Sequence, residues 1–146
     1  EIISGTDQVT AIEIHDPLMV GQVGFDRNIM KTFEQYNVSY ILKATNANSI
    51  TQVIWDEDLT DSLIEELRGQ YYEVTVKPVA LVCTLGTNIA QPGIIAKATA
   101  ALANNNINVD AISQSLKQVN MQFVIGRDDY RKAIIALNDA LCVKPG

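Results

Sequence analysis

Histidine, cysteine and tryptophan are scarce in this chain of 146 residues, which contains one His, two Cys and one Trp. Two cysteines cannot form a disulfide scaffold, and together with a single His they nearly exclude a Cys/His zinc site. No Ser-His-Asp arrangement can be assembled around the lone His15, which we interpret as structural. No apolar run approaches the ~20 residues of a membrane-spanning helix, so we expect no membrane partner.

Positive charge is also limited, because 11 Lys and Arg stand against 17 Asp and Glu, for a net charge of −6. An acidic chain without a basic stripe argues against nucleic acid as the main partner. Hydrophobic residues make up 47% and charged residues 19%, a composition typical of a globular domain. The chain starts with Glu1 and shows no signal-peptide pattern, so we expect a fragment of a longer, cytoplasmic protein.

The chain contains two copies of one pattern, in which an apolar strand leads through a glycine-bearing loop to an amphipathic helix. The helix-opening glycines, Gly24 and Gly93, each stand thirteen residues before an asparagine, Asn37 or Asn106, where the helix is predicted to end. A second strand, a polar turn, a third strand and a second helix follow in both copies. The predicted strands are 9–14, 38–42, 49–55 and 71–76 in the first copy and 79–84, 107–112 and 120–125 in the second.

The second helix of each copy is predicted to begin after an aspartate N-cap, Asp58 or Asp128, and Lys77-Pro78 is predicted to close the first copy. This order predicts an α+β fold of two ferredoxin-like βαββαβ units, each with an antiparallel sheet and its helices on one face. The second copy lacks a last strand, which we expect the N-terminal residues to supply. The predicted domains are therefore 9–78, inserted in a second unit made of 1–8 and 79–146.

No catalytic constellation, cofactor-binding motif or metal site is predicted. The acidic run 56–58 with Asp61 fits a helix N-terminus better than a metal site, because carboxylates there interact favourably with the helix dipole. Cys83 and Cys142 are interpreted as small buried hydrophobic residues. The strand-to-helix loops 16–24 and 86–93 could bring free N–H groups to the carboxylate of a small ligand such as an amino acid, or could be ordinary turns. The polar turns 45–48 and 115–118 could pair with another sheet or bind the amine of a ligand, or they could be ordinary solvated hairpin loops.

These loops and strands resemble a known family. The stretch from Met19 to Phe25, with the Asn37-Val38-Ser39 that follows the helix, resembles the first ACT unit of aspartate kinases. Pro92-Gly93-Ile94, the run 111–115 and the run 120–125 are similar to the second ACT unit. The resemblance covers essentially the whole chain.

The resemblance implies the C-terminal regulatory region of an aspartate kinase, an enzyme that phosphorylates aspartate with ATP. ATP and magnesium would belong to an upstream kinase domain, so no cofactor is expected here. In the family, tandem ACT units pair with those of a second subunit and bind lysine or threonine, which inhibits the kinase. The resemblance therefore implies a homodimer and a small amino-acid effector. The positions that match the family's effector site are Met19, Gln22, Gly24, Phe25, Asp26, Ser39, Tyr40, Ile41, Thr45, Asn46, Ala47 and Asn48.

Two departures from the family weaken the expectation of lysine binding. Lysine-sensitive members usually carry an acidic residue where Ile41 stands, and Thr-Ser-Glu-Val where this chain has residues 45–48. An isoleucine offers no partner to a buried ammonium group, which is costly to desolvate. In the second copy, residues 115–118 replace the usual Gly-Ser-Ser-Glu. Threonine, another neutral amino acid or no effector remain open.

Three rival interpretations belong to other functional classes. The chain could be a free-standing or differently fused ACT module that senses a ligand, or a purely structural dimerisation module. An enzyme built on the ferredoxin-like scaffold, as in small acylphosphatases, needs an arginine in the first loop to hold phosphate. Residues 16–24 and 86–93 contain no Arg or Lys, which disfavours that class.

Overall fold

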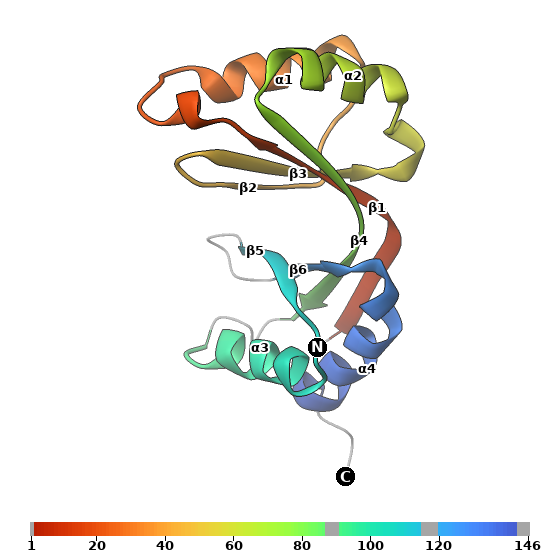
Figure 1. Ribbon diagram of the computed structural model, residues 1–146. Helices are drawn as coiled ribbons and strands as arrows, with labels where there is room; N and C mark the ends of the chain where they lie inside the picture. Colours follow the sequence, from red (N-terminus) through yellow and green to blue (C-terminus); the bar gives the residue numbers. More distant parts are fainter. Residues whose placement is uncertain (1, 87–90, 115–119, 143–146) are drawn as a thin grey trace. The chain divides into compact units, whose positions relative to one another are not determined.

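The computed structural model describes residues 2–86, 91–114 and 120–142 (Figure 1). The chain divides into two compact units, one of residues 8–78 and one of residues 1–7 with 79–146. We call them the inserted unit and the split unit, and each is described by itself. Two long strands, β1 (Ile2–His15) and β4 (Glu73–Leu85), contribute residues to both units.

The inserted unit has its strands in the order β2-β3-β1-β4. Antiparallel pairing joins β1 to β3, from Val9 opposite Trp55 to His15 opposite Ser49, and joins β2 to β3. Helices α1 and α2 cover one face of this sheet (Figure 1). Besides β1 and β4, its elements are η1 (Pro17–Met19), α1 (Phe25–Gln35), β2 (Leu42–Thr45), β3 (Ser49–Trp55), η2 (Asp56–Asp58) and α2 (Asp61–Gln70).

The split unit repeats this arrangement with the order β1-β4-β6-β5. Strand β4 pairs antiparallel with β6, from Val79 opposite Gly126 to Leu85 opposite Asn120. Strand β5 pairs antiparallel with β6 and carries an irregularity between Val109 and Ala111. Its further elements are α3 (Ile94–Asn104), β5 (Val109–Gln114), β6 (Asn120–Gly126), η3 (Arg127–Asp129) and α4 (Tyr130–Leu141).

Each unit has its own apolar core between its helices and one face of its sheet. In the inserted unit Ile12 and Ile14 alternate along β1 and meet Phe25, Ile29 and Phe33, which recur along α1 at helical spacing. In the split unit the corresponding core contains alternate residues of β4 and β6 packed against α3 and α4. Its largest members are Leu102, Met121, Phe123, Ile125 and Leu137.

The N-terminal residues lie in the split unit. Ile3 packs against the core of that unit. The backbone at Gly5 lies so close to β4 that a Cβ atom placed there would stand 2.2 Å from the carbonyl oxygen of Leu81 and 3.1 Å from Cε1 of Tyr130. The predicted fold class, two ferredoxin-like units with the first inserted in the second, is confirmed.

Several predicted element bounds are wrong. The predicted strand 38–42 is irregular up to residue 41, because Asn37 adopts a left-handed conformation (φ 56°) and the N–H of Val38 donates back to the carbonyl of Phe33 at 2.9 Å. Regular pairing starts only at β2 and ends at Thr45, which was predicted to lie in the turn. Strand β5 begins at Val109 rather than at 107. The pair Lys77-Pro78 does not end a strand, since β4 continues through it.

The predicted aspartate caps are also wrong. Thr60 is the N-cap of α2, and its side chain accepts from the N–H of Leu63 at 3.2 Å. Asp58 lies instead in the 3-10 turn η2, which comes before the helix. Asp129, not Asp128, stands at the start of α4, again after a 3-10 turn. Cys83 and Cys142 are half-buried rather than fully buried.

Candidate functional site

The loop before α1 is held in place by one buried carboxylate. Asp16 is 6% exposed, and its two oxygens accept from the N–H of Leu18 at 2.9 Å and of Tyr72 at 3.2 Å. Met19, a predicted site residue, is buried in the core of the inserted unit, where its side chain anchors the loop. The loop is therefore a fixed connection between β1 and α1.

Helix α1 begins without a side-chain cap. Its N-cap is Gly24 at φ 84°, a left-handed conformation that favours glycine, and this residue makes no side-chain cap hydrogen bond. Gly93 takes the same place before α3, at φ 92°. The rest of that second loop, residues 87–90, lies outside the described residues, as does the predicted turn 115–118. An uncapped helix start offers N–H groups to a carboxylate.

Gln22 and Phe25 lie on one hollow of about 480 Å³ beside α1. Phe25 is buried, with its ring 5.4 Å from that of Tyr71, whereas Gln22 is exposed. Burial raises the pKa of the Tyr71 hydroxyl, and the negative charge of Asp16 raises it further. The hollow is lined by Asp16, Leu18, Gln22, Phe25, Asn28, Lys31, Thr32, Gln35, Gln70 and Tyr71.

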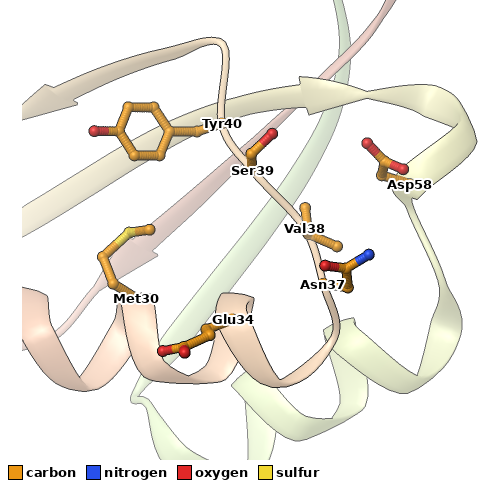
Figure 2. Close-up of a pocket in the computed structure, with 7 residues that line it drawn as sticks. All are labelled: Met30, Glu34, Asn37, Val38, Ser39, Tyr40 and Asp58. Atoms are coloured by element: carbon orange, nitrogen blue, oxygen red, sulfur yellow. The ribbon is translucent and has the colours of Figure 1, made fainter.

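Ser39 and Tyr40 belong to a different hollow, of about 600 Å³, on the other part of the predicted site (Figure 2). Figure 2 shows Met30 and Glu34 on helix α1, and Ser39 and Tyr40 on the irregular segment that follows it. The hollow is lined by Met30, Glu34, Asn37, Val38, Ser39, Tyr40 and Asp58. Residues 38–40, which the sequence predicts as the start of a strand, lie in this irregular segment and line the hollow.

Lys43 contacts two of the predicted site residues, Asp26 and Tyr40, although it is not itself one of the matched positions. Its ammonium group forms an ion pair with Asp26 in the first turn of α1. The same ammonium lies 5.5 Å from the ring centre of Tyr40, within range of a cation–π interaction. The Lys43 side chain is only 15% exposed. The signal for this pair is a basic residue on a strand that faces a matched acidic residue on a helix. Such a signal can be recognised only once the fold is known.

The turn 45–48 has a structural role that the sequence left open. The side-chain oxygen of Asn46 accepts from the N–H of Asn48 at 3.1 Å, the N–H of Ser49 at 2.9 Å and the hydroxyl of Ser49 at 3.0 Å. The carbonyl of Asn48 accepts from the N–H of Asp16 at 3.1 Å, which ties this turn to the start of the loop. Thr45 and Ala47 are exposed.

The remaining predicted residue, Ile41, is half-buried, and its N–H donates to the carbonyl of Val53 at 2.7 Å. The structure thus distributes the predicted residues over two hollows, a turn and the Asp26–Lys43–Tyr40 contact of the inserted unit. Within the described residues no group of three or more His, Cys, Asp or Glu could hold a metal ion, and no helix is long and apolar enough to cross a membrane.

Comparisons with known proteins agree with this architecture. The ACT domain family matches residues 82–141. The aspartate kinase Ask_Ect of Stutzerimonas stutzeri is 40% identical over 144 residues, which cover 97% of this chain and 30% of that protein. The crystal structure of Clostridium acetobutylicum aspartate kinase superposes with a TM-score of 0.87 at 31% identity, covering 94% of this chain and 34% of that one.

A third comparison shows how far the similarity extends. A putative C-terminal regulatory domain of aspartate kinase from Porphyromonas gingivalis W83 has a TM-score of 0.81 at 22% identity, covering 97% of both chains. In its fold the chain is similar to this regulatory domain. The resemblance predicted from the sequence is confirmed, and the chain spans about a third of the length of the two full aspartate kinases, Ask_Ect and the Clostridium enzyme.

Proposed function

We propose that this chain is the amino-acid-sensing regulatory part of an aspartate kinase, and that a bound amino acid controls an attached kinase domain. The observation that carries the proposal is the 40% identity to an aspartate kinase over 97% of the chain. The attached domain would transfer phosphate from ATP to aspartate and would hold ATP and magnesium. This chain would contribute binding and regulation, not catalysis.

The effector site would use the twelve matched positions of the inserted unit in unequal ways. The uncapped start of α1 after Gly24 suits the carboxylate of an amino acid, because it presents N–H groups at the positive end of the helix dipole. Gln22, exposed beside this start, would donate a further hydrogen bond. Met19 and Asn46 would act by positioning, since one is in the core and the other holds its own turn.

Regulation would follow from a shift between two arrangements of the assembled protein. An effector can shift such a balance only by its difference in affinity for the two states. Strand β2 is at one edge of the strand order of the inserted unit, and β5 is at one edge of that of the split unit. Such edges have unpaired backbone groups and favour pairing with another chain, so a second copy is the proposed partner.

The test is calorimetric titration of the purified chain with L-threonine and, separately, L-lysine, while light scattering records its oligomeric state. We expect saturable binding of one amino acid to a dimer. Gln22→Ala should weaken that binding about fivefold, because it removes one hydrogen bond of about 1 kcal/mol. The control Asn138→Ala changes an exposed amide of α4 and should leave binding unchanged.

Two other outcomes favour the rival interpretations. A dimer that binds neither amino acid would support a purely structural dimerisation module. Binding by the isolated chain that has no effect on kinase activity, when the chain is attached to a kinase domain, would support a sensing module that controls another process.

A further inference from the structure

We infer that Lys43 sets the effector specificity of the inserted unit, and that it excludes amino acids with a positively charged side chain. This inference deepens the proposed function and rests on it. Among the twelve matched positions only Asp26 carries a formal charge. Lys43 pairs with that carboxylate, so the one negative charge is already neutralised within the chain.

The position of the ammonium group supports the inference independently of the charge count. It lies between a residue of the helix start, Asp26, and a residue of the facing segment, Tyr40, both of which are matched site positions. The ring of Tyr40 offers its face to a cation, and Lys43 already occupies that face at 5.5 Å. Among the matched positions, a ligand ammonium would therefore find Asp26 and Tyr40 already engaged by Lys43.

Repulsion adds to this competition. The Lys43 side chain is 15% exposed, so its charge is only partly screened by water. A second ammonium within a few ångströms would be repelled by this like charge. Repulsion between like charges is one way in which binding sites reject wrong partners. Ile41, two residues earlier, supplies no compensating carboxylate. A zwitterionic amino acid with a neutral side chain avoids this conflict.

The test uses calorimetric titration of the chain with L-lysine and L-threonine as probes. Lys43→Met removes the charge, keeps most of the stem and frees Asp26 and Tyr40. We expect the wild-type chain to bind threonine and to bind lysine at least about tenfold more weakly. In Lys43→Met the lysine affinity should rise about tenfold, with a smaller change for threonine.

Two matched variants control the measurement. Lys43→Arg keeps the charge and should keep the wild-type preference, which also shows that the site tolerates substitution. Lys97→Met makes the same charge change on the exposed face of α3 and should alter neither affinity. Thermal midpoints of all variants would show that each one is folded.

The outcomes separate this inference from the proposed function. Threonine binding with no gain of lysine affinity in Lys43→Met overturns the inference and leaves the proposed function intact. Equal affinity of the wild-type chain for lysine and threonine also overturns it, and would indicate Glu34 or Asp58 of the adjoining hollow as cation acceptors. Binding of neither probe by any variant overturns both.

Discussion

At the scale of single residues, Gly5 leaves the least room for a side chain among the six glycines Gly5, Gly21, Gly24, Gly69, Gly93 and Gly126. A Cβ atom there would lie 2.2 Å from the carbonyl oxygen of Leu81, which is backbone and cannot move aside cheaply. Gly5→Ala should therefore lower the free energy of unfolding by about 2 kcal/mol or more, as overpacking does elsewhere. Urea denaturation followed by circular dichroism measures this.

Gly69→Ala is the matched control. Gly69 lies in α2, and a Cβ atom placed there would have no neighbouring atom within 4 Å. Alanine at this position should therefore be neutral or stabilise by up to about 1 kcal/mol. Equal stability of Gly5→Ala and the wild-type chain would contradict the close approach of β1 to β4 at this point.

Tyr71 should make the stability pH-dependent on the alkaline side. Burial and the charge of Asp16 raise the pKa of its hydroxyl above the ordinary value of 10.0. The folded chain therefore keeps this proton at pH values where the unfolded chain has lost it. The resulting stability is present below pH ~10 and is lost as the pH rises through the folded pKa.

Tyr71→Phe tests this dependence, because phenylalanine keeps the ring beside Phe25 and has no group to ionise. Thermal midpoints measured between pH 8 and 11 should fall less steeply above pH ~10 in the variant than in the wild-type chain. Parallel curves for the two proteins would contradict a raised pKa. Tyr72→Phe, at an exposed tyrosine next in sequence, is the control.

Single residues also show where sequence reasoning loses information. Motif matching selected Met19 and Asn46, but one is buried in the core and the other closes its own turn. It missed Lys43, because the ion pair with Asp26 joins residues 17 positions apart that only the folded β2 brings to α1. Matching a family motif shows which part of the chain forms the site. It does not show which charged residues pair there, because those pairs depend on tertiary contacts.

At the scale of secondary-structure elements, α2 offers a clear comparison of two possible caps. Thr60 accepts from the N–H of Leu63 at 3.2 Å, whereas Asp58 lies in the preceding 3-10 turn. Thr60→Ala should cost about 1 kcal/mol of stability, the usual contribution of an N-cap side chain. Asp58→Ala should change it by less than about 0.5 kcal/mol. Urea denaturation of both variants distinguishes them, and the reverse order would restore the sequence-based assignment.

The errors in element bounds share one physical origin. Apolar periodicity predicted the helices and third strands well, and β3 spans the predicted residues 49–55. It failed at the ends of elements, where a few hydrogen bonds determine at which residue a helix or strand begins or ends. The left-handed Asn37 and the bond from Val38 to Phe33 delay β2, and 3-10 turns shift the starts of α2 and α4. Such local bonds leave little trace in a hydrophobic pattern.

At the scale of the whole molecule, the repeat was the most informative sequence feature. Two equal spacings, from Gly24 to Asn37 and from Gly93 to Asn106, indicated two copies of one unit, of which the second lacks its last strand. The missing last strand of the second copy then predicted the role of the N-terminal residues. The continuity of β1 and β4 through both units was not predicted, because Lys77-Pro78 reads as a break.

The role of the N-terminal strand leads to a test on the whole chain. Deletion of residues 1–7 removes Ile3 from the core of the split unit and exposes the β4 backbone beside Leu81. The free energy of unfolding of that unit should fall by about 3 kcal/mol, from one partly buried isoleucine and the lost strand hydrogen bonds.

Hydrogen exchange read out by peptide should show where the deletion acts. Protection should fall in residues 79–85 and 120–126, whereas α1 and β3 should keep theirs, because the inserted unit has its own core. Two point variants refine the result: Ile3→Ser should reproduce part of the loss, and Ile2→Ser, at a side chain 65% exposed, should not. If the deletion instead lowered protection first in residues 49–55, the first seven residues would belong to the inserted unit, and the insertion topology would be wrong.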